Sequence, residues 1–273
     1  MRRAKRGMKL YGKTFGIKEG AESTLVTSDL AMIQEIFAKQ FDNFYTRKAL
    51  SVGVDVDKDP RVNLFASRGG RWKRLRAISA PSFSVNALKK IRPVVEESVR
   101  NMLSIMEERH GNGQPFNIHE FFMEYTMDTI GRLVMGQKES KYFNNPRVEV
   151  AKALFMRDLD RFIFHITNVF PFLRGPALQL IRSGGGKPAR AFHALMGEME
   201  TVVTERIRHR EQHPDGETED DQDFIDIFLD TAAESVHDNA QFNLSKSSVE
   251  KTLTVDEVIA QAVVFLLADF PHF

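Results

Sequence analysis

An indole and a guanidinium group lie four residues apart in a short basic segment, at Trp72 and Arg76. If the segment is helical, residues four apart share one face, so the two side chains lie one above the other. Both groups are hydrogen-bond donors only, and a guanidinium can bind two oxygens at once. The pair therefore suits a carboxylate or a phosphate, with Arg74 lying away from it. The alternative is an amphipathic helix with a half-buried Trp and solvated charges.

Other groupings of reactive side chains indicate no second chemistry. The sequence contains no Cys, so these 273 residues can form no disulfide, thiolate metal site or cysteine nucleophile. His209 and His213 have the spacing of helical metal ligands, but the neighbouring Arg208 and Arg210 would repel a cation, which favours a solvated helix end. The glycines at 184–186 follow no predicted strand and precede no Gly-Lys-Ser/Thr, so they do not predict a phosphate loop.

Acidic and aromatic clusters each have a structural explanation. Asp220, Asp221 and Asp223 lie in an acidic, turn-rich segment predicted to be a mobile surface loop, which argues against a catalytic carboxylate pair. The chain has 22 Phe against 4 Tyr and 1 Trp, and Phe supplies apolar area without a polar group. Four of these side chains could line a substrate pocket, although core packing is the favoured interpretation. The four are Phe162, Phe164, Phe170 and Phe172.

The composition is that of an ordinary globular protein, with 42% hydrophobic and 27% charged residues. Lys and Arg number 38 against 37 Asp and Glu, and this balance argues against a nucleic-acid partner. Residues 1–9 form a basic tail, predicted to be solvated and frayed, with weak contact to anionic lipid as the alternative. No apolar run of about 18 residues follows, so the sequence predicts neither a membrane-spanning helix nor a signal peptide.

The elements that position these side chains are mainly helices, with a small β-sheet near the N-terminus. Strand-like runs at 14–17 and 24–27 flank a turn, and Ser28 is predicted to cap the helix that follows. Pro81 ends the helix that carries Trp72. Apolar spacing predicts further helices from Asn86 to Gly111, from Ile118 to Gly136, within 148–172, from Lys187 to His209 and from Phe224, with a polar linker at 239–251.

The last predicted helix begins with a capping box at Thr254–Glu257. It is apolar nearly all round as far as Ala268, which predicts burial in the middle of a larger fold. Because only Asp269–Phe273 follow, we expect a fold truncated within this helix. The uncovered helix would leave an apolar patch and make the 273-residue chain poorly soluble.

Four segments resemble, in order and spacing, those of microsomal cytochrome P-450 enzymes, the haem-thiolate monooxygenases, and in particular their animal drug-metabolising branch. Residues 71–84 resemble the C-helix and its end, and residues 125–131 the E-helix signature. Residues 11–17, with 26–30, look like the first strand and the entry to the A-helix, and residues 41–48 resemble the stretch before the B-helix. The resemblance implies a cytochrome P-450 fold, with residues 10–273 as the N-terminal part of one domain.

This resemblance implies roles for particular residues. In the family, the Trp and the Arg one turn later donate to a haem propionate, which assigns Trp72 and Arg76 to cofactor binding, with Arg47 as a weaker third. The complete enzyme would insert one oxygen atom from O₂ into an apolar small molecule, using haem and electrons from a reductase. Asp269 stands where the family has Gly and Pro271 stands near the expected acid, so the oxygen-activating role is not carried over.

The resemblance also limits what these residues imply alone. The family's iron-ligating Cys, its N-terminal membrane anchor and its Pro-rich hinge have no counterpart in the sequence, so we assign no catalytic residue and no metal ligand. The family is found at the cytosolic face of the endoplasmic reticulum membrane, whereas a chain without the anchor could be cytoplasmic. The alternative function is a haemless, non-catalytic fragment or interaction protein. An unrelated helical scaffold or peripheral membrane module is disfavoured by the order of the motifs.

Overall fold

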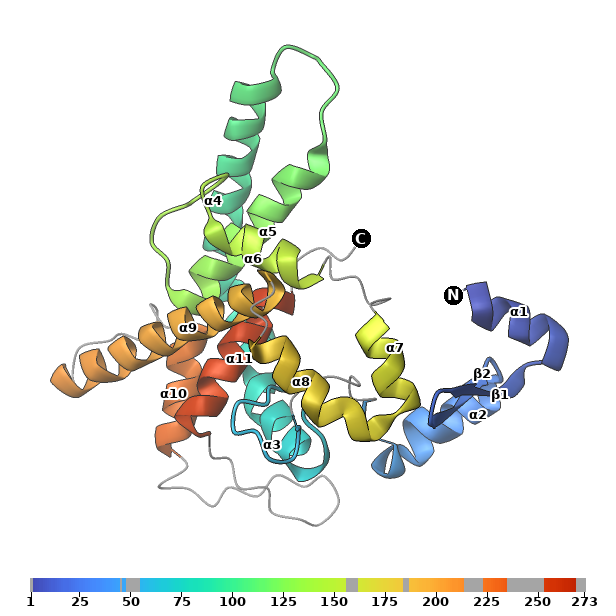
Figure 1. Cartoon of the computed structure of the whole chain (residues 1–273). Coiled ribbons are helices and arrows are strands. Elements are labelled where there is room, and N and C mark those ends of the chain that lie inside the picture. Colours follow the sequence, from blue (N-terminus) through green and yellow to red (C-terminus); the bar gives the residue numbers. More distant parts are fainter. Residues whose placement is uncertain are drawn as a thin grey trace. The chain divides into compact units, whose positions relative to one another are not determined.

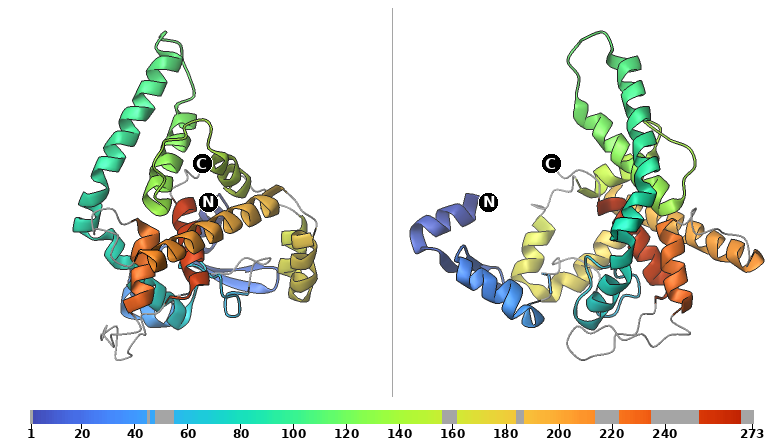
Figure 2. Two further views of the ribbon diagram at one scale, coloured as in Figure 1. Left: turned by 90° about the vertical axis from the view of Figure 1, so that its left-hand side faces the viewer. Right: turned by 180° about the vertical axis from the view of Figure 1, so that it is seen from behind.

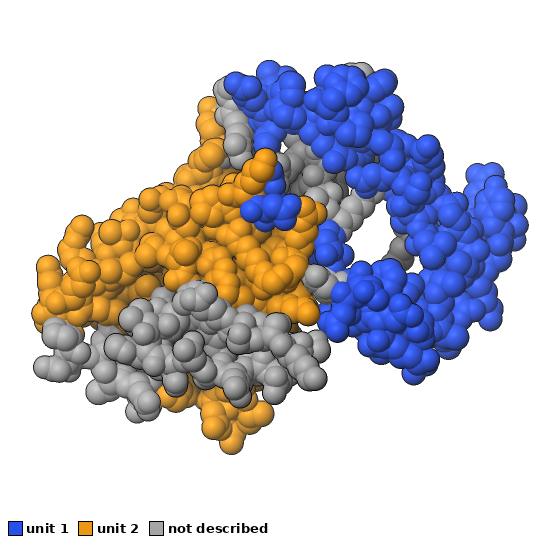
Figure 3. Space-filling view, turned by 90° about the horizontal axis from the view of Figure 1, so that it is seen from below, with its two compact units in different colours: residues 1–57, 158–185 blue, residues 58–157, 186–273 orange. Residues whose placement is uncertain are grey.

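The computed structural model describes residues 2–44, 46–47, 55–155, 162–183, 187–213, 223–234 and 253–268 (Figure 1). The chain divides into two compact units, one of residues 1–57 with 158–185 and the other of residues 58–157 with 186–273 (Figure 3). The architecture is mainly helical with a two-stranded sheet near the N-terminus, which confirms the predicted fold class. No described helix combines the length and the apolar character that crossing a bilayer requires.

The first unit contains an antiparallel hairpin of β1 (Thr14–Glu19) and β2 (Glu22–Thr27), where the sequence predicts it. The turn between the strands places Gly20 at a φ of +66°, a left-handed conformation that favours glycine. A Cβ atom at this position would also come within 2.3 Å of the carbonyl oxygen of Asn168 at the end of α7 (Phe162–Val169). The turn thus packs closely against a helix more than a hundred positions later in the chain.

Two predictions for the first unit are wrong. Residues predicted to be a frayed tail form the helix α1 (Arg2–Tyr11). This basic helix packs on β1, where the ring centroids of Tyr11 and Phe15 lie 6.1 Å apart, and the contact with the sheet stabilises it. Asp29, not Ser28, caps α2 (Leu30–Gln34), because its carboxylate accepts hydrogen bonds from two free backbone N–H groups. The other elements are η1 (Glu35–Lys39), η2 (Phe41–Asn43), η4 (Pro171–Leu173) and α8 (Arg174–Ser183).

The second unit begins with α3 (Gly69–Ser79), the helix predicted to carry the Trp72–Arg76 pair. It continues into the short η3 (Ala80–Phe83), which contains the helix-ending Pro, and a tight connection leads to α4 (Val85–His110). α4 forms an antiparallel pair with α5 (Ile118–Met135) (Figure 1). Gly136 ends α5 in the left-handed conformation, as predicted.

Four more helices complete the second unit: α6 (Pro146–Phe155), α9 (Lys187–Gln212), α10 (Phe224–Glu234) and α11 (Val255–Ala268). α11 packs against α5, α9 and α10, and both views of Figure 2 place it among them. The predicted capping box is present, since the Glu257 N–H donates to Thr254 Oγ1 and the Thr254 N–H to Glu257 Oε2, each at 3.2 Å.

Eight of the 14 residues of α11 are buried by these neighbours. The prediction that this helix lies uncovered is therefore wrong for the described residues, because α5, α9 and α10 already enclose most of its surface. Poor solubility was expected from an uncovered apolar helix, and in the described part of the chain this helix is mostly covered.

The acidic segment before α10 also differs from its prediction. Asp223 does not lie in a mobile surface loop but is buried, and its carboxylate accepts from Arg206 Nη2 at 2.9 Å and from the N–H of Asp226 at 3.0 Å. Asp226 is fully buried and is paired with Arg206 and with Arg210 of α9. Two carboxylates and two guanidiniums thus join α9 to α10. The run of acidic residues in the sequence before Asp226 does not predict these pairs.

Several predictions concern residues outside the described ranges. They include Asp220, Asp221, the glycines at 184–186, the linker at 239–251 and the segment Asp269–Phe273. The side chains of Phe162 and Phe164 are likewise outside the description. Whether the two units belong to one domain stays a prediction.

Candidate functional site

The Trp72–Arg76 pair lies on α3 at the predicted helical spacing. Trp72 is half-buried, whereas Arg76 is exposed. Among the described residues, no hydrogen bond or ion pair involves the Arg76 guanidinium. The exposed Arg76 guanidinium carries five N–H donors, and an anionic oxygen acceptor would satisfy them.

The other two guanidiniums of α3 serve a different purpose. Arg74 binds the carboxylate of Glu257 with both terminal nitrogens, at 2.8 and 2.5 Å, and Arg71 Nε donates to the same carboxylate at 3.1 Å. Glu257 lies on α11 and its side chain is only 4% exposed. The prediction that Arg74 lies away from the pair is confirmed, and two of the four cations of the segment 71–76 are paired with one buried carboxylate.

The pKa of Glu257 reflects this arrangement. Burial by itself would raise the pKa, but the hydrogen bonds from Arg74 and from the Thr254 N–H, together with the charges of Arg74 and Arg71, hold it below the ordinary value of 4.5. The carboxylate is therefore ionised at neutral pH, as its two guanidinium partners require.

Sequence reasoning missed Glu257, although a signal was present. The residue was recognised only as a member of the capping box. It is also an acid on a helix that is otherwise apolar, and a buried acid of this kind needs a cation nearby. Arg71 and Arg74, one turn apart on a second predicted helix, were the available candidates.

Arg47 is the third residue assigned to cofactor binding. It is exposed and belongs to the first unit, whereas Trp72 and Arg76 belong to the second. Its approach to the pair stays a prediction.

The donor set of α3 fits a haem propionate. A propionate is a carboxylate on a flexible arm, and the pair offers donors only, with no competing acid hydrogen-bonded to Arg76 within the described part of the chain. Arg71 and Arg74 are bound to Glu257, and Trp72 and Arg76 are the residues of this helix that would hold the group.

The segment that resembles the E-helix signature supports the fold through the carboxylate of Asp128. The carboxylate of Asp128 is 1% exposed and accepts from Ser98 Oγ at 3.1 Å, Ser140 Oγ at 3.0 Å and the Lys141 N–H at 3.2 Å. These bonds join α4, α5 and the segment after α5. A buried carboxylate with three donors is a structural group.

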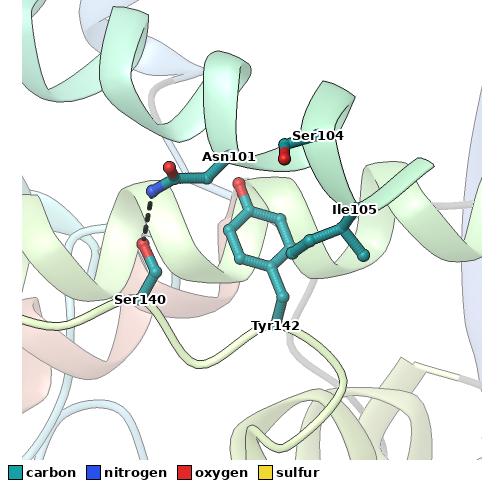
Figure 4. A pocket seen from close by; sticks show the side chains of 5 residues that line it. All are labelled: Asn101, Ser104, Ile105, Ser140 and Tyr142. Atoms are coloured by element: carbon teal, nitrogen blue, oxygen red, sulfur yellow. Dashed lines mark hydrogen bonds between the residues drawn. The ribbon is translucent and has the colours of Figure 1, made fainter. Parts of the chain in front are cut away.

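A surface pocket of about 380 Å³ lies beside this network (Figure 4). Asn101 Nδ2 donates to Ser140 Oγ at 3.1 Å across it, and the Tyr142 hydroxyl donates to the carbonyl oxygen of Ser98 at 2.6 Å. Burial, and then the charge of Asp128, raise the pKa of Tyr142. The lining is uncharged, which gives the pocket no means of selecting an ionic ligand; it consists of Asn101, Ser104, Ile105, Ser140 and Tyr142.

The remaining candidates are the histidine pair of α9 and the phenylalanines around η4. The rings of His209 and His213 stack at 4.7 Å near the end of α9, and the described residues contain no group of three metal-ligating side chains. Phe170 and Phe172 are 46% and 76% exposed, so the interpretation of these two as core residues is wrong. They lie around η4, where a short helix with Pro at its start turns the chain and leaves both rings outside.

The described fold is mainly helical, and α3 carries an indole and a guanidinium whose donors suit an anionic group, a combination typical of helical proteins that bind a cofactor or another small molecule. The family model for cytochrome P450 matches residues 3–268 of the sequence. The chain belongs to the cytochrome P450 family.

Relatives in Caenorhabditis elegans agree with this assignment. The protein named cytochrome P450 cyp-13B1 is 42% identical over 265 residues, which cover 95% of this chain and 51% of the relative. The protein named CYP13A10 is 40% identical over 268 residues, with coverage of 96% and 51%. The chain spans about half the length of the curated relatives it matches, and the family uses haem.

Proposed function

We propose that the complete protein is a haem-dependent monooxygenase that inserts one oxygen atom from O₂ into an apolar small molecule, with a reductase as electron donor. The observation that supports this function is the Trp72–Arg76 pair on α3, in a chain of the cytochrome P450 family. Haem, when bound through a thiolate, supplies the oxygen chemistry. The 273 residues contain no Cys, so the thiolate would come from other residues of the complete protein.

In this proposal the residues of α3 bind and orient the cofactor. Arg76 would donate N–H groups to a propionate carboxylate, and Trp72 would add a further donor from the preceding turn. The half-buried indole would shield such a carboxylate from water on one side and so strengthen the charge-assisted bonds beside it. Arg47 would add a further positive charge to the same group.

Arg76→Ala is expected to weaken the binding of haemin to the 273-residue chain about tenfold, since a hydrogen bond to a charged group contributes roughly 1.5–3 kcal/mol. Absorbance titration measures the affinity. Haemin dimethyl ester, whose propionates carry no charge, should bind the variant and the wild type equally. Lys89→Ala removes one exposed positive charge from α4 instead of α3 and is the matched control.

Two outcomes would contradict this role for Arg76. The variant could bind haemin as well as the wild type does, or it could lose affinity for haemin and its ester alike. A wild-type chain that shows no preference for haemin over the ester would instead favour a haemless interaction protein.

We also propose that the complete protein acts at the cytosolic face of the endoplasmic reticulum membrane and that α1 contacts the anionic lipid surface. The helix exposes the cations of Lys5, Arg6 and Lys9 together with the apolar side chains of Leu10 and Tyr11. Cations attract anionic headgroups, and the apolar side chains add area that enters the interface. A cytoplasmic location is the alternative.

The triple variant Lys5→Glu, Arg6→Glu, Lys9→Glu is expected to bind phosphatidylserine vesicles at least about a hundredfold more weakly, at roughly 1 kcal/mol per cation lost. Co-sedimentation measures the affinity. The wild type should release these vesicles as salt is raised, and vesicles of phosphatidylcholine alone are the control. Equal binding of the wild type to both kinds of vesicle would contradict the electrostatic contact.

A further inference from the structure

Glu257 is the one acid of α11 that contacts α3 through described bonds. Its carboxylate receives four hydrogen bonds, from Arg71 Nε, from two nitrogens of Arg74 and from the Thr254 N–H, at 2.5–3.2 Å. The guanidiniums are about one-fifth exposed and the carboxylate is 4% exposed, so solvent screens the pairing little. The bidentate contact with Arg74 fixes both the distance and the direction between the two helices.

The same guanidinium of Arg71 also anchors the segment before α3. Its Nη1 donates to the carbonyl oxygen of Asp59 at 2.7 Å, and its Nη2 donates to the carbonyl oxygen of Pro60. Arg71 is therefore held from two directions, by a carboxylate of α11 and by two backbone carbonyls. A side chain held in this way has little freedom to follow a rotation of its helix.

The Trp72–Arg76 pair projects from a different side of α3. At 3.6 residues per turn, successive residues are about 100° apart, so Arg71, Arg74 and the buried Leu75 and Ile78 share one face. Trp72 and Arg76 lie roughly a third of a turn away from that face. Any rotation of α3 about its own axis would move the pair through the same angle, and the bonds to Glu257 oppose such a rotation.

We propose that Glu257 is a positioning residue, which holds α3 in the rotation that directs Trp72 and Arg76 toward a haem propionate. This inference rests on the proposed function and deepens it. Glu257 does not touch the cofactor in this account. It acts through Arg71 and Arg74, and this role accounts for an ionised acid on a helix that is mostly buried.

The test compares Glu257→Gln with Asp256→Asn in the 273-residue chain. Both changes remove one negative charge from the first turn of α11, but Asp256 is paired with Arg61 at 2.7 Å, outside α3. Trp72 is the only Trp of the chain, so its fluorescence reports the position of α3 directly. We expect acrylamide to quench Trp72 more strongly in Glu257→Gln than in the wild type, and equally in Asp256→Asn and the wild type.

Haemin binding provides the second measurement. Glu257→Gln should reduce the preference for haemin over its dimethyl ester about fivefold, within the range of coupling between contacting residues. Because the effect passes through the Trp72–Arg76 pair, adding Glu257→Gln to Arg76→Ala should reduce that preference by less than Glu257→Gln does in the wild type. A role in stability alone would lower the melting temperature and leave the preference unchanged.

The proposal is overturned if Glu257→Gln keeps the helical circular dichroism of the wild type together with its acrylamide quenching. If that variant fails to fold, Arg74→Gln replaces it, because Glu257 then keeps Arg71 and the Thr254 N–H. Wild-type quenching in a folded Arg74→Gln variant would overturn the proposal in the same way. A wild-type chain with no preference for haemin contradicts the proposed function, whereas the quenching experiment still decides whether Glu257 positions Trp72.

Discussion

Arg206→Ala is expected to lower the free energy of unfolding by about 3–5 kcal/mol at pH 8, because it leaves the buried carboxylate of Asp223 without a counter-charge. Arg206 pairs with Asp223, which is 5% exposed at its side chain, and with Asp226, which is 1% exposed. Arg210 remains to bind Asp226 at 3.0 Å, but Asp223 keeps no guanidinium among the described residues.

The size of this loss should depend on pH. Burial, followed by the charge of Asp226, raises the pKa of Asp223 to about 7 even with Arg206 present. Removing Arg206 raises it further. A carboxyl whose folded pKa is raised binds its proton more tightly in the folded state, so its effect on stability becomes less favourable as pH increases above the unfolded value. The loss of unfolding free energy caused by Arg206→Ala should therefore be larger at pH 8 than at pH 5.

Urea unfolding at the two pH values measures the difference. Arg92→Ala is the control, since Arg92 and Glu96 form an ion pair on the exposed side of α4 and such pairs contribute about 0–1 kcal/mol. An equal loss at pH 5 and pH 8 would indicate that Arg206 contributes through packing and not through its charge.

The helices of the second unit were predictable because each depends on local signals. α5 is an example, with an apolar stripe and a glycine at its end in the left-handed conformation. The capping box of α11 was predicted residue by residue, since both of its hydrogen bonds join positions three apart. Local patterns of this kind do not depend on the rest of the fold.

What the sequence did not predict depends on partners distant along the chain. The residues of α1 carry charges of one sign and were predicted to form a tail, because their sequence alone does not indicate the contact with β1. In the sequence Asp223 is one of several neighbouring acids, and the Arg206 that binds it lies 17 positions away. Periodicity reports which face of an element is apolar, and it does not report which cation meets which acid.

The candidate site also combines a local relation that the sequence predicts with a distant contact that it does not. Trp72 and Arg76 were predicted to share a face because helical spacing alone determines that relation. Glu257 was not assigned to the site because 183 positions separate it from Arg74. The two donors are thus a local feature of α3, whereas their direction depends on a contact that only the folded unit contains.

Phe228→Ala should cost about 3–5 kcal/mol of unfolding free energy, the range for truncating a buried aromatic side chain. The ring of Phe228 is fully buried and lies 6.4 Å from that of Phe224 and 5.7 Å from that of Phe265. Phe83 of η3 joins the same group, with its ring centroid 5.4 Å from that of Phe265. Four rings from η3, α10 and α11 thus form one aromatic cluster.

The position of Phe228 makes the cluster important for the site as well as for stability. η3 directly continues α3, so a cavity left at Phe228 would loosen the end of the helix that carries Trp72. We expect a lower urea midpoint and a Trp72 emission that changes in the same transition. Phe172→Ala is the matched control, because that ring is 76% exposed and its loss should change stability by less than about 0.5 kcal/mol. Equal losses for the two variants would contradict the assignment of Phe228 to the core that supports α3.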